Sequence, residues 1–186
     1  DEVLKEKEII PYNVKLPKVS ICYKIKKSLF DVSYYELNNY MSMYLTLLFG
    51  NTSNFFDKVI NENIVYDYYY YVDSTKDYFT LSFEATSEKC DQFIEIIDNT
   101  LKNETIKEED FNRIKKVWIA DEIKSFDSVG TIASSILTDI IYYNTFHNQT
   151  IDEIRKMKYE VLKEIIKKLK LNNRAIVFLV PNDSKI

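Results

Sequence analysis

The sequence predicts an α+β fold, a two-layer sandwich in which helices cover an about four-stranded, mainly antiparallel sheet. Stretches with a two-residue hydrophobic period, typical of half-buried strands, are mixed with stretches whose apolar residues recur every three or four positions, typical of helices. Their order is strand, two helices, strand pair, helical block and final strand. Because the helices are grouped instead of alternating with single strands, a sheet covered by helices is favoured over a parallel α/β fold.

Four segments have the composition of strands. Lys18–Lys26 alternates between apolar and polar residues, as a half-buried strand does. Tyr66–Val72 is rich in tyrosine, and Tyr78–Ala85 alternates again after a short polar connector, so the two should form an antiparallel hairpin. Arg174–Val180 is a nearly continuous apolar run, which indicates a strand placed inside the sheet or covered on both sides.

Two helices are expected between the first strand and the hairpin. Ser33, followed by Glu36, forms a capping box ahead of an apolar stripe that begins at Leu37. Gly50 follows that helix and should take the left-handed position that often ends one. The cap segment Asn51-Thr52-Ser53 then marks the start of the second helix.

The segment after the hairpin is mostly helical. Caps are predicted at Ser87, at Thr105 with Glu108, and at Thr150 with Glu153. Between them Ser128–Tyr142 has a wide apolar face, which we expect to lie between other elements. The last helix, Lys158–Lys170, sets an apolar stripe against a lysine-rich face.

The composition indicates one soluble domain, residues 1–186, with an N-terminal arm over 1–17 and the folded unit over 18–181. A net charge of −4 argues against a broad nucleic-acid-binding surface, and the longest apolar run is far too short to span a membrane. For the same reasons we expect neither nucleic-acid nor membrane partners. Cys22 and Cys90 form no C-x-x-C pair, so we expect a reduced, cytoplasmic setting. The chain begins at Asp1 and not at Met, and we expect it to be a fragment.

The residue inventory excludes most hydrolytic sites within this chain. Zinc hydrolysis through H-x-x-E-H or H-E-x-x-H needs two imidazoles, and His147 is the only histidine. Two isolated glycines cannot form a phosphate-binding loop, and no G-x-S-x-G motif is present. The carboxylates around Glu108 fit the first turn of a helix better than a metal site. His147 could act as a general base, but its polar surroundings favour a surface loop.

Tyrosines are the candidate recognition residues. Alternate phenols of the tyrosine-rich strand must lie on opposite sheet faces, one packed on helices and the other free to stack on a partner or substrate. We expect Tyr66, Tyr68 and Tyr70 to face that partner or substrate. Packing within the sheet is the alternative role.

Several segments together resemble one enzyme family. Residues 48–59, with Gly50, Ser53 and a Phe-Phe pair, are similar to the start of the second half-repeat in pitrilysin/insulinase-type zinc peptidases. Ile106–Lys115 is similar to a later helix of that half, and Ser125–Ala133 to a connector in a bacterial branch described as predicted zinc proteases. The closing strand Ala175–Pro181 also fits, so the resemblance runs from about Lys18 to Pro181.

The resemblance implies the LuxS/mitochondrial-processing-peptidase-like fold and a place in a two-part enzyme. In such peptidases the first half carries the zinc motif, and the second half has the same fold without metal. The chain then is the non-catalytic C-terminal half, which forms a wall of a peptide-binding chamber opposite the catalytic half. The resemblance implies that this piece contains no catalytic and no metal-ligating residues and is inactive by itself. Zinc is expected in the N-terminal half of an active parent.

The implied partners are the N-terminal half of the same polypeptide or a related subunit, together with a peptide substrate. Many members also place an Arg and, seven positions later, a Tyr in the second half. The matching positions here are Ile60 and Asp67, or Asn61 and Tyr68 after a shift of one, so the Arg is absent. Two alternatives remain: a scaffold subunit of a heteromeric peptidase-like complex without catalytic activity, and an unrelated α+β enzyme that uses His147.

Overall fold

The computed structural model describes residues 2–75, 77–146 and 150–182. It contains five strands, β1 (Lys7–Tyr12), β2 (Lys18–Lys26), β3 (Asp67–Ser74), β4 (Tyr78–Thr86) and β5 (Arg174–Pro181). The α-helices of the described residues are α1 (Tyr34–Phe49), α2 (Asn54–Asn61), α3 (Cys90–Asn103), α4 (Glu108–Ser125), α5 (Val129–Tyr143), α6 (Thr150–Lys156) and α7 (Tyr159–Lys168). The predicted α+β class is confirmed.

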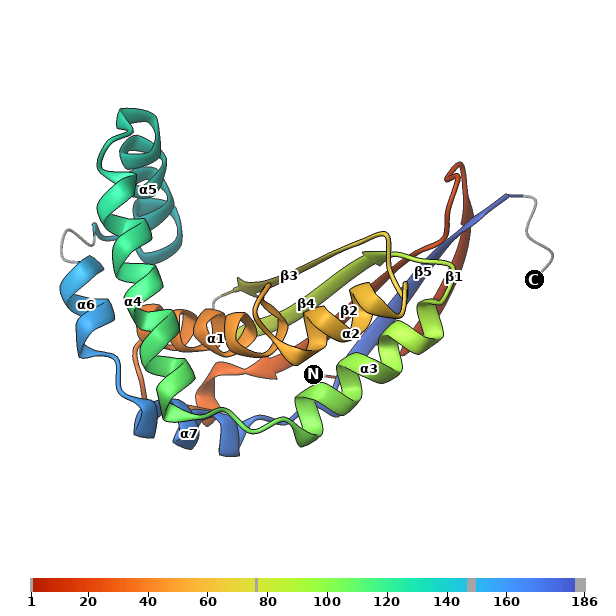
Figure 1. Cartoon of the computed structure of the whole chain (residues 1–186), viewed down its shortest axis with the longest axis horizontal. Coiled ribbons are helices and arrows are strands. Elements are labelled where there is room, and N and C mark those ends of the chain that lie inside the picture. Colours follow the sequence, from red (N-terminus) through yellow and green to blue (C-terminus); the bar gives the residue numbers. More distant parts are fainter. Residues whose placement is uncertain (1, 76, 147–149, 183–186) are drawn as a thin grey trace.

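All five strands form one mixed sheet in the order β1-β5-β2-β4-β3. β1 pairs in parallel with β5, and the other three pairings are antiparallel. Helices α1, α2 and α3 lie along one side of this sheet, which gives the expected two layers (Figure 1). β5 has a strand on either side, as its apolar sequence indicated.

The sheet has one strand more than the about four that we expected. The additional strand, β1, lies within residues 1–17, which were expected to be an N-terminal arm outside the folded unit. Its signal in the sequence is weak because nearly all of its residues are exposed, so no strong alternation develops. Pro11 is tolerated because β1 is an edge strand, where a missing N–H removes no ladder hydrogen bond.

The core fills the space between the sheet and the helices. Strand β2 points Ile21 and Tyr23 into it, and β4 points Leu81 and Phe83 the same way, each at most 1% exposed. Helix α1 supplies the largest helical share, seen in its buried residues Leu37, Tyr40, Met41, Met43, Tyr44, Leu45, Leu48 and Phe49. Burial of these side chains contributes the main stabilising free energy of the domain, at roughly 25 cal/mol per Å² of apolar surface removed from water.

Two of the predicted caps are confirmed. The Ser33 hydroxyl accepts a hydrogen bond from the Glu36 amide at 3.2 Å, and the Ser53 hydroxyl accepts one from the Phe56 amide at 3.1 Å. Each bond satisfies an amide at a helix start that has no partner within the helix.

Three other helix-end predictions are wrong. Gly50 has φ −72°, so it does not take the left-handed conformation. The helix expected after Ser87 begins at Cys90, because the Ser87 hydroxyl bonds to the Ile64 carbonyl and accepts from the Lys89 amide two residues on. Helix α4 begins at Glu108, and no side chain caps it, so Thr105 lies outside the helix.

Helices α4 and α5 form an arm that stands away from the sheet. We call residues 108–143 the α4–α5 arm; Figure 1 shows it rising beyond the end of α1. Its base is fixed through α4, where the Phe111 and Tyr159 rings are 6.0 Å apart and Lys115 donates to the Met157 carbonyl at 2.7 Å. The wide apolar face of α5 was expected to lie between other elements, but within this chain much of it is exposed.

Candidate functional site

One face of the sheet is not covered by the helices among the described residues. Residues that pair directly across neighbouring strands point to the same face, so the strand register defines what we call the open face. One row across it runs Val177, Ser20, Glu84 and Tyr69, and the next runs Ala175, Cys22, Ser82 and Tyr71. In the middle strands the small residues Ser20, Cys22 and Ser82 share the open face with charged residues such as Lys24 and Glu84, and tyrosines lie along the β3 edge.

The other edge of the open face is apolar. β1 and β5 pair Ile10 with Leu179, and Tyr12 follows on the same face of β1. Ile10 and Tyr12 are large and yet 39% and 59% exposed, whereas Leu179 is half-buried. Small residues between an apolar edge and an aromatic edge give the open face a trough-like profile.

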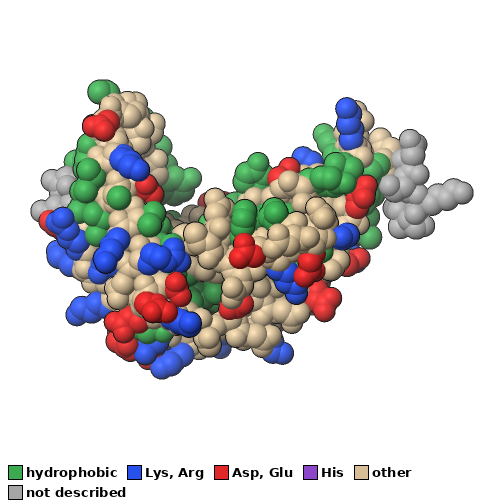
Figure 2. Space-filling view, in the orientation of Figure 1, with side chains coloured by type: hydrophobic (Ala, Val, Ile, Leu, Met, Phe, Trp, Pro, Cys, Tyr) green, Lys and Arg blue, Asp and Glu red, His purple; other side chains and the backbone are tan. Residues whose placement is uncertain are grey.

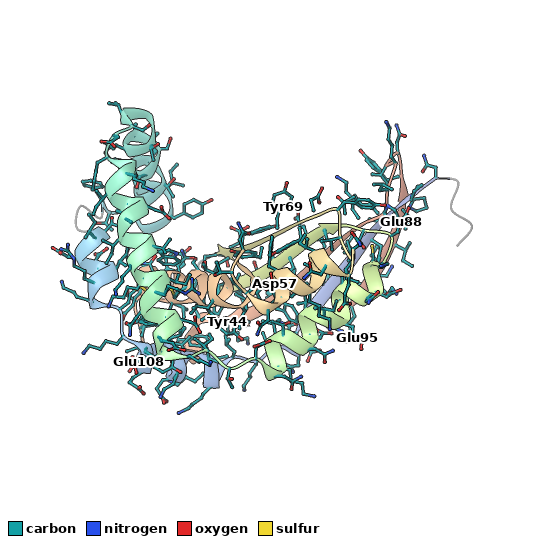
Figure 3. All side chains as sticks on the ribbon, in the orientation of Figure 1. Tyr44, Asp57, Tyr69, Glu88, Glu95 and Glu108 are labelled. Carbon is teal, nitrogen blue, oxygen red and sulfur yellow. The ribbon has the colours of Figure 1, made fainter. Side chains whose placement is uncertain are left out.

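The tyrosines of β3 alternate between the two faces. Tyr69 and Tyr71 are 63% and 41% exposed and lie on the open face, where Figure 3 shows Tyr69 pointing away from the helices. Tyr68 and Tyr70 point the other way: the Tyr68 hydroxyl donates to the Phe49 carbonyl at 2.7 Å, and the Tyr70 and Phe49 rings are 6.3 Å apart.

The prediction that Tyr68 and Tyr70 face a partner is therefore corrected, because both share their face with the half-buried Val72 and pack on the helices. Burial also raises the pKa of Tyr68. Tyr66 lies just ahead of β3 and is 61% exposed, so its availability to a partner agrees with the structure while its role stays a prediction. The sequence carried a signal for the correct phase, since Asp67 and Asp73 share one face of the strand with Tyr69 and Tyr71 and charged residues favour an exposed face.

A depression of about 230 Å³ lies at one end of the open face. Its lining combines an apolar floor with a charged rim, from the residues Lys18, Val19, Ser20, Asp67, Tyr69, Glu84, Ala85, Thr86, Val177 and Leu179. Figure 2 shows the wider hollow between the α4–α5 arm and the far end of the sheet, with hydrophobic side chains on both of its sides.

Two carboxylates of the rim are held in place by hydrogen bonds. The Tyr71 hydroxyl donates to Glu84 Oε1 at 2.8 Å, and the Thr86 amide donates to Asp67 Oδ1 at 3.2 Å. The bond to Glu84, helped by partial burial, raises the pKa of Tyr71 to about 12, so this phenol remains a neutral donor at physiological pH. The rim is therefore a polar border whose carboxylates are held in position.

The residues present do not fit a hydrolytic zinc ion. Residues 2–75, 77–146 and 150–182 contain no cluster of three or more His, Cys, Asp or Glu side chains that could hold a metal ion. The sequence has a single histidine, His147, which lies outside the described residues. No helix in the described part of the chain is long and apolar enough to span a membrane.

The positions that correspond to an Arg–Tyr pair lie where α2 ends and β3 begins. Ile60, in the last turn of α2, is 43% exposed and offers no charge. In the shifted register the Tyr68 hydroxyl already bonds to the Phe49 carbonyl, so it is not free to hold a substrate. Neither register therefore provides an Arg–Tyr pair in this chain.

The described residues thus form a sheet with helices packed on one face, and they contain no cluster that could hold a metal ion. Residues 2–117, well over half of the chain, match the family described as the peptidase M16 inactive domain. The chain belongs to this family. A comparison by sequence with curated proteins finds no match.

Solved structures show the same fold. A protein described as an M16-like peptidase, from Alicyclobacillus acidocaldarius, superposes with a TM-score of 0.81 at 18% identity, over 95% of this chain and 43% of its own. A protease from Helicobacter pylori gives 0.71 at 18% identity, over 94% of this chain and 44% of its own. The inactive peptidase domain of a protein described as a zinc protease, from Bordetella parapertussis, gives 0.69 at 12% identity and is covered over 97% of its length. The chain thus spans less than half of the first two proteins.

Proposed function

We propose that this chain is the non-catalytic C-terminal half of a zinc-dependent peptidase, and that its open face forms a wall of a chamber around a peptide substrate. The observation that supports this most directly is the composition of that face. The middle of the face is polar, but the large side chains of Tyr12 and Tyr69 are exposed at its two edges, where they can contact a peptide.

An extended peptide fits such a surface for geometric reasons. Its side chains alternate, so those that point down can occupy the trough around Cys22 and Ser82 while the backbone passes above. Tyr69 presents an aromatic body with a polar end, which can pack on apolar peptide side chains and still hydrogen bond. The wall would therefore hold a peptide with little dependence on its sequence.

Zinc and its ligands would belong to the other half of the parent, since this chain has a single histidine. In that arrangement zinc polarises the scissile carbonyl and activates water. This chain would exclude bulk water and hold the peptide. Its residues would affect substrate binding and not the chemical step.

Cys22 provides a direct test, because its free thiol lies on the open face. Cys90 is only 8% exposed, and burial raises the pKa of its thiol, so it should react slowly and serve as an internal control. We expect a thiol-specific reagent to modify Cys22 at least tenfold more slowly in the parent protein holding a peptide than in the isolated chain. Equal rates in the two forms would exclude a closed chamber over this face.

Kinetics of the parent separate a chamber wall from a scaffold. With a fluorogenic peptide library, Tyr69→Ala should raise KM about 5- to 30-fold with little change in kcat, the effect of losing roughly 1–2 kcal/mol of uniform binding. Ile60→Ala is the matched control, because it removes an exposed apolar side chain from the helical layer. A parent without peptidase activity would instead support the scaffold subunit, the second function that the sequence allowed.

A further inference from the structure

Helix α5 carries an apolar surface that is left exposed by the part of the chain that the structure describes. Val129, Leu137 and Ile141 are 83%, 60% and 74% exposed, and Ile140 is 50% exposed. Scattered exposed apolar residues are ordinary on a protein surface, but a contiguous group of them marks a contact site.

The spacing of these residues makes the group contiguous. Positions 129, 133, 137 and 141 are each four residues apart, and Ile140 lies between the last two, so all fall on one stripe of the helix. We call Val129, Ala133, Leu137, Ile140 and Ile141 the α5 stripe. A second face of the same helix holds the less exposed Ile132 and Ile136 and the buried Asp139. The apolar surface of α5 is therefore wide, with one part half-buried in this chain and the neighbouring part, the α5 stripe, exposed.

Helix α5 has too few charged residues for a helix that simply faces solvent. Asp139 is the only charged residue among its 15 residues, and it is 9% exposed. A helix that lies on a lipid surface normally carries Lys or Arg on its polar face, and α5 has neither. The polar side of α5 is made of hydroxyl residues such as Thr131, Ser135 and Thr138, which suits a partner protein better than an anionic membrane.

We propose that the α5 stripe is the surface on which the other half-repeat of the parent docks, with an apolar helix or sheet surface of that half covering it. This inference rests on the proposed function. The α4–α5 arm rises on the side of the sheet to which Tyr69 points, so a second half that closes over the open face meets the arm (Figures 1 and 3).

The solved relatives indicate which partner covers the α5 stripe. The structures from Alicyclobacillus and Helicobacter contain this fold over 43% and 44% of their length, which leaves more than a domain of equal size in each. The exposed Phe126, at the turn that leads into α5, extends the apolar surface beyond the stripe. A partner as large as this chain can cover the whole length of the arm.

Hydrogen exchange of the α5 amides tests the proposal. We expect amides of residues 132–142 to exchange at least tenfold more slowly in the parent protein, with both halves present, than in the isolated chain. The double variant L137K/I141K should return the parent to the fast exchange of the isolated chain. The matched control S135K/T138K adds the same two charges on the polar side of the helix and should leave the slow exchange in place.

Three results would overturn the proposal. Equal α5 exchange in the parent and in the isolated chain would show that the other half does not cover the stripe. An isolated chain that sediments as a dimer with slow α5 exchange would assign the stripe to a second copy. Slow exchange of the isolated chain only with anionic phospholipid vesicles would assign it to a membrane. Because L137K/I141K changes exposed side chains only, the thermal midpoint of the isolated chain should stay unchanged, which separates docking from misfolding.

The Cys22 measurement separates this inference from the proposed function. If Cys22 is shielded in the parent while α5 exchanges freely, the chamber wall stands and the halves meet elsewhere. If neither is shielded, both proposals fail.

Discussion

Gly50→Ala is the substitution whose effect the structure defines most sharply. Gly50 follows α1, and its amide donates to the Thr46 carbonyl at 3.0 Å. A Cβ at this position would lie 2.4 Å from the Thr46 oxygen, a backbone atom that cannot swing away, and 3.4 Å from the Tyr70 hydroxyl. The close approach, and not a left-handed conformation, is why glycine is needed here.

Two effects of opposite sign decide the magnitude. Relieving the clash must shift the end of α1, and strain of this kind typically costs about 1–3 kcal/mol. Alanine can adopt the φ of −72° and ψ of 168° found at this position without backbone strain. Because it also lowers the conformational entropy of the unfolded chain, it adds about 0.4–1 kcal/mol to the free energy of unfolding. The steric effect is larger, so Gly50→Ala should lower the free energy of unfolding by about 1–2 kcal/mol, which corresponds to roughly 2–8 °C in the thermal midpoint.

Urea unfolding followed by circular dichroism measures this difference, and the other glycine of the chain is the matched control. Gly130 lies in the first turn of α5, where a Cβ would meet nothing nearer than the Ser128 hydroxyl at 4.0 Å. Gly130→Ala should therefore be neutral or stabilise the chain by up to about 1 kcal/mol. If Gly50→Ala proved as stable as the natural chain, the contact with Thr46 would not constrain this position.

Two further predictions concern tyrosines. Tyr68→Ala removes a ring packed 5.3 Å from Phe55 and a hydrogen bond to the backbone, so it should destabilise the chain by about 2–4 kcal/mol. Tyr69→Ala removes an exposed ring and should change the unfolding free energy by less than about 0.5 kcal/mol. The reverse order in urea unfolding would contradict the assigned faces. Burial, followed by the bond to Asp98, raises the pKa of Tyr23 above its unfolded value near 10, so its stabilising contribution is complete below about pH 10 and is lost as the pH rises toward the folded pKa. Unfolding free energies measured between pH 8 and 11 should fall less steeply for Tyr23→Phe, and parallel slopes for the two proteins would refute this.

The parts of the fold that depend on local order could be predicted from the sequence. Alternation in Lys18–Lys26 identified β2 with the correct buried face, because a strand places successive side chains on opposite sides wherever it lies. Ser33 and Ser53 marked helix starts because a cap bonds to an amide only three residues away.

Elements that depend on distant partners were missed or misplaced. β1 is a strand only because β5 lies beside it, about 170 residues later in the chain, and its own residues are nearly all exposed. Ser87 fits a cap by sequence, but in the fold its hydroxyl bonds to the Ile64 carbonyl, 23 residues away. Local patterns cannot reveal such competition for a hydrogen-bonding group.

The candidate site was likewise predicted only in part from the sequence. That one half of the β3 tyrosines would pack and the other half would be exposed followed from the sequence, but the wrong half was assigned. A tyrosine is apolar enough for a core and polar enough for a surface, so its type does not decide its face. Asp67 and Asp73, which share a face of β3 with Tyr69 and Tyr71, were the better indicator of the exposed face.

By itself, the sequence determined the α+β class, the two confirmed helix caps, the buried face of β2 and the lack of a two-histidine zinc motif, all of which depend on residue type and near-neighbour spacing. Only the tertiary structure decided the five-strand order, the open face with its tyrosine edge and the exposure of the α5 stripe. Each of these depends on which distant segments lie together and on which surface is left without a neighbour, and burial of that kind is a property of the whole packed chain.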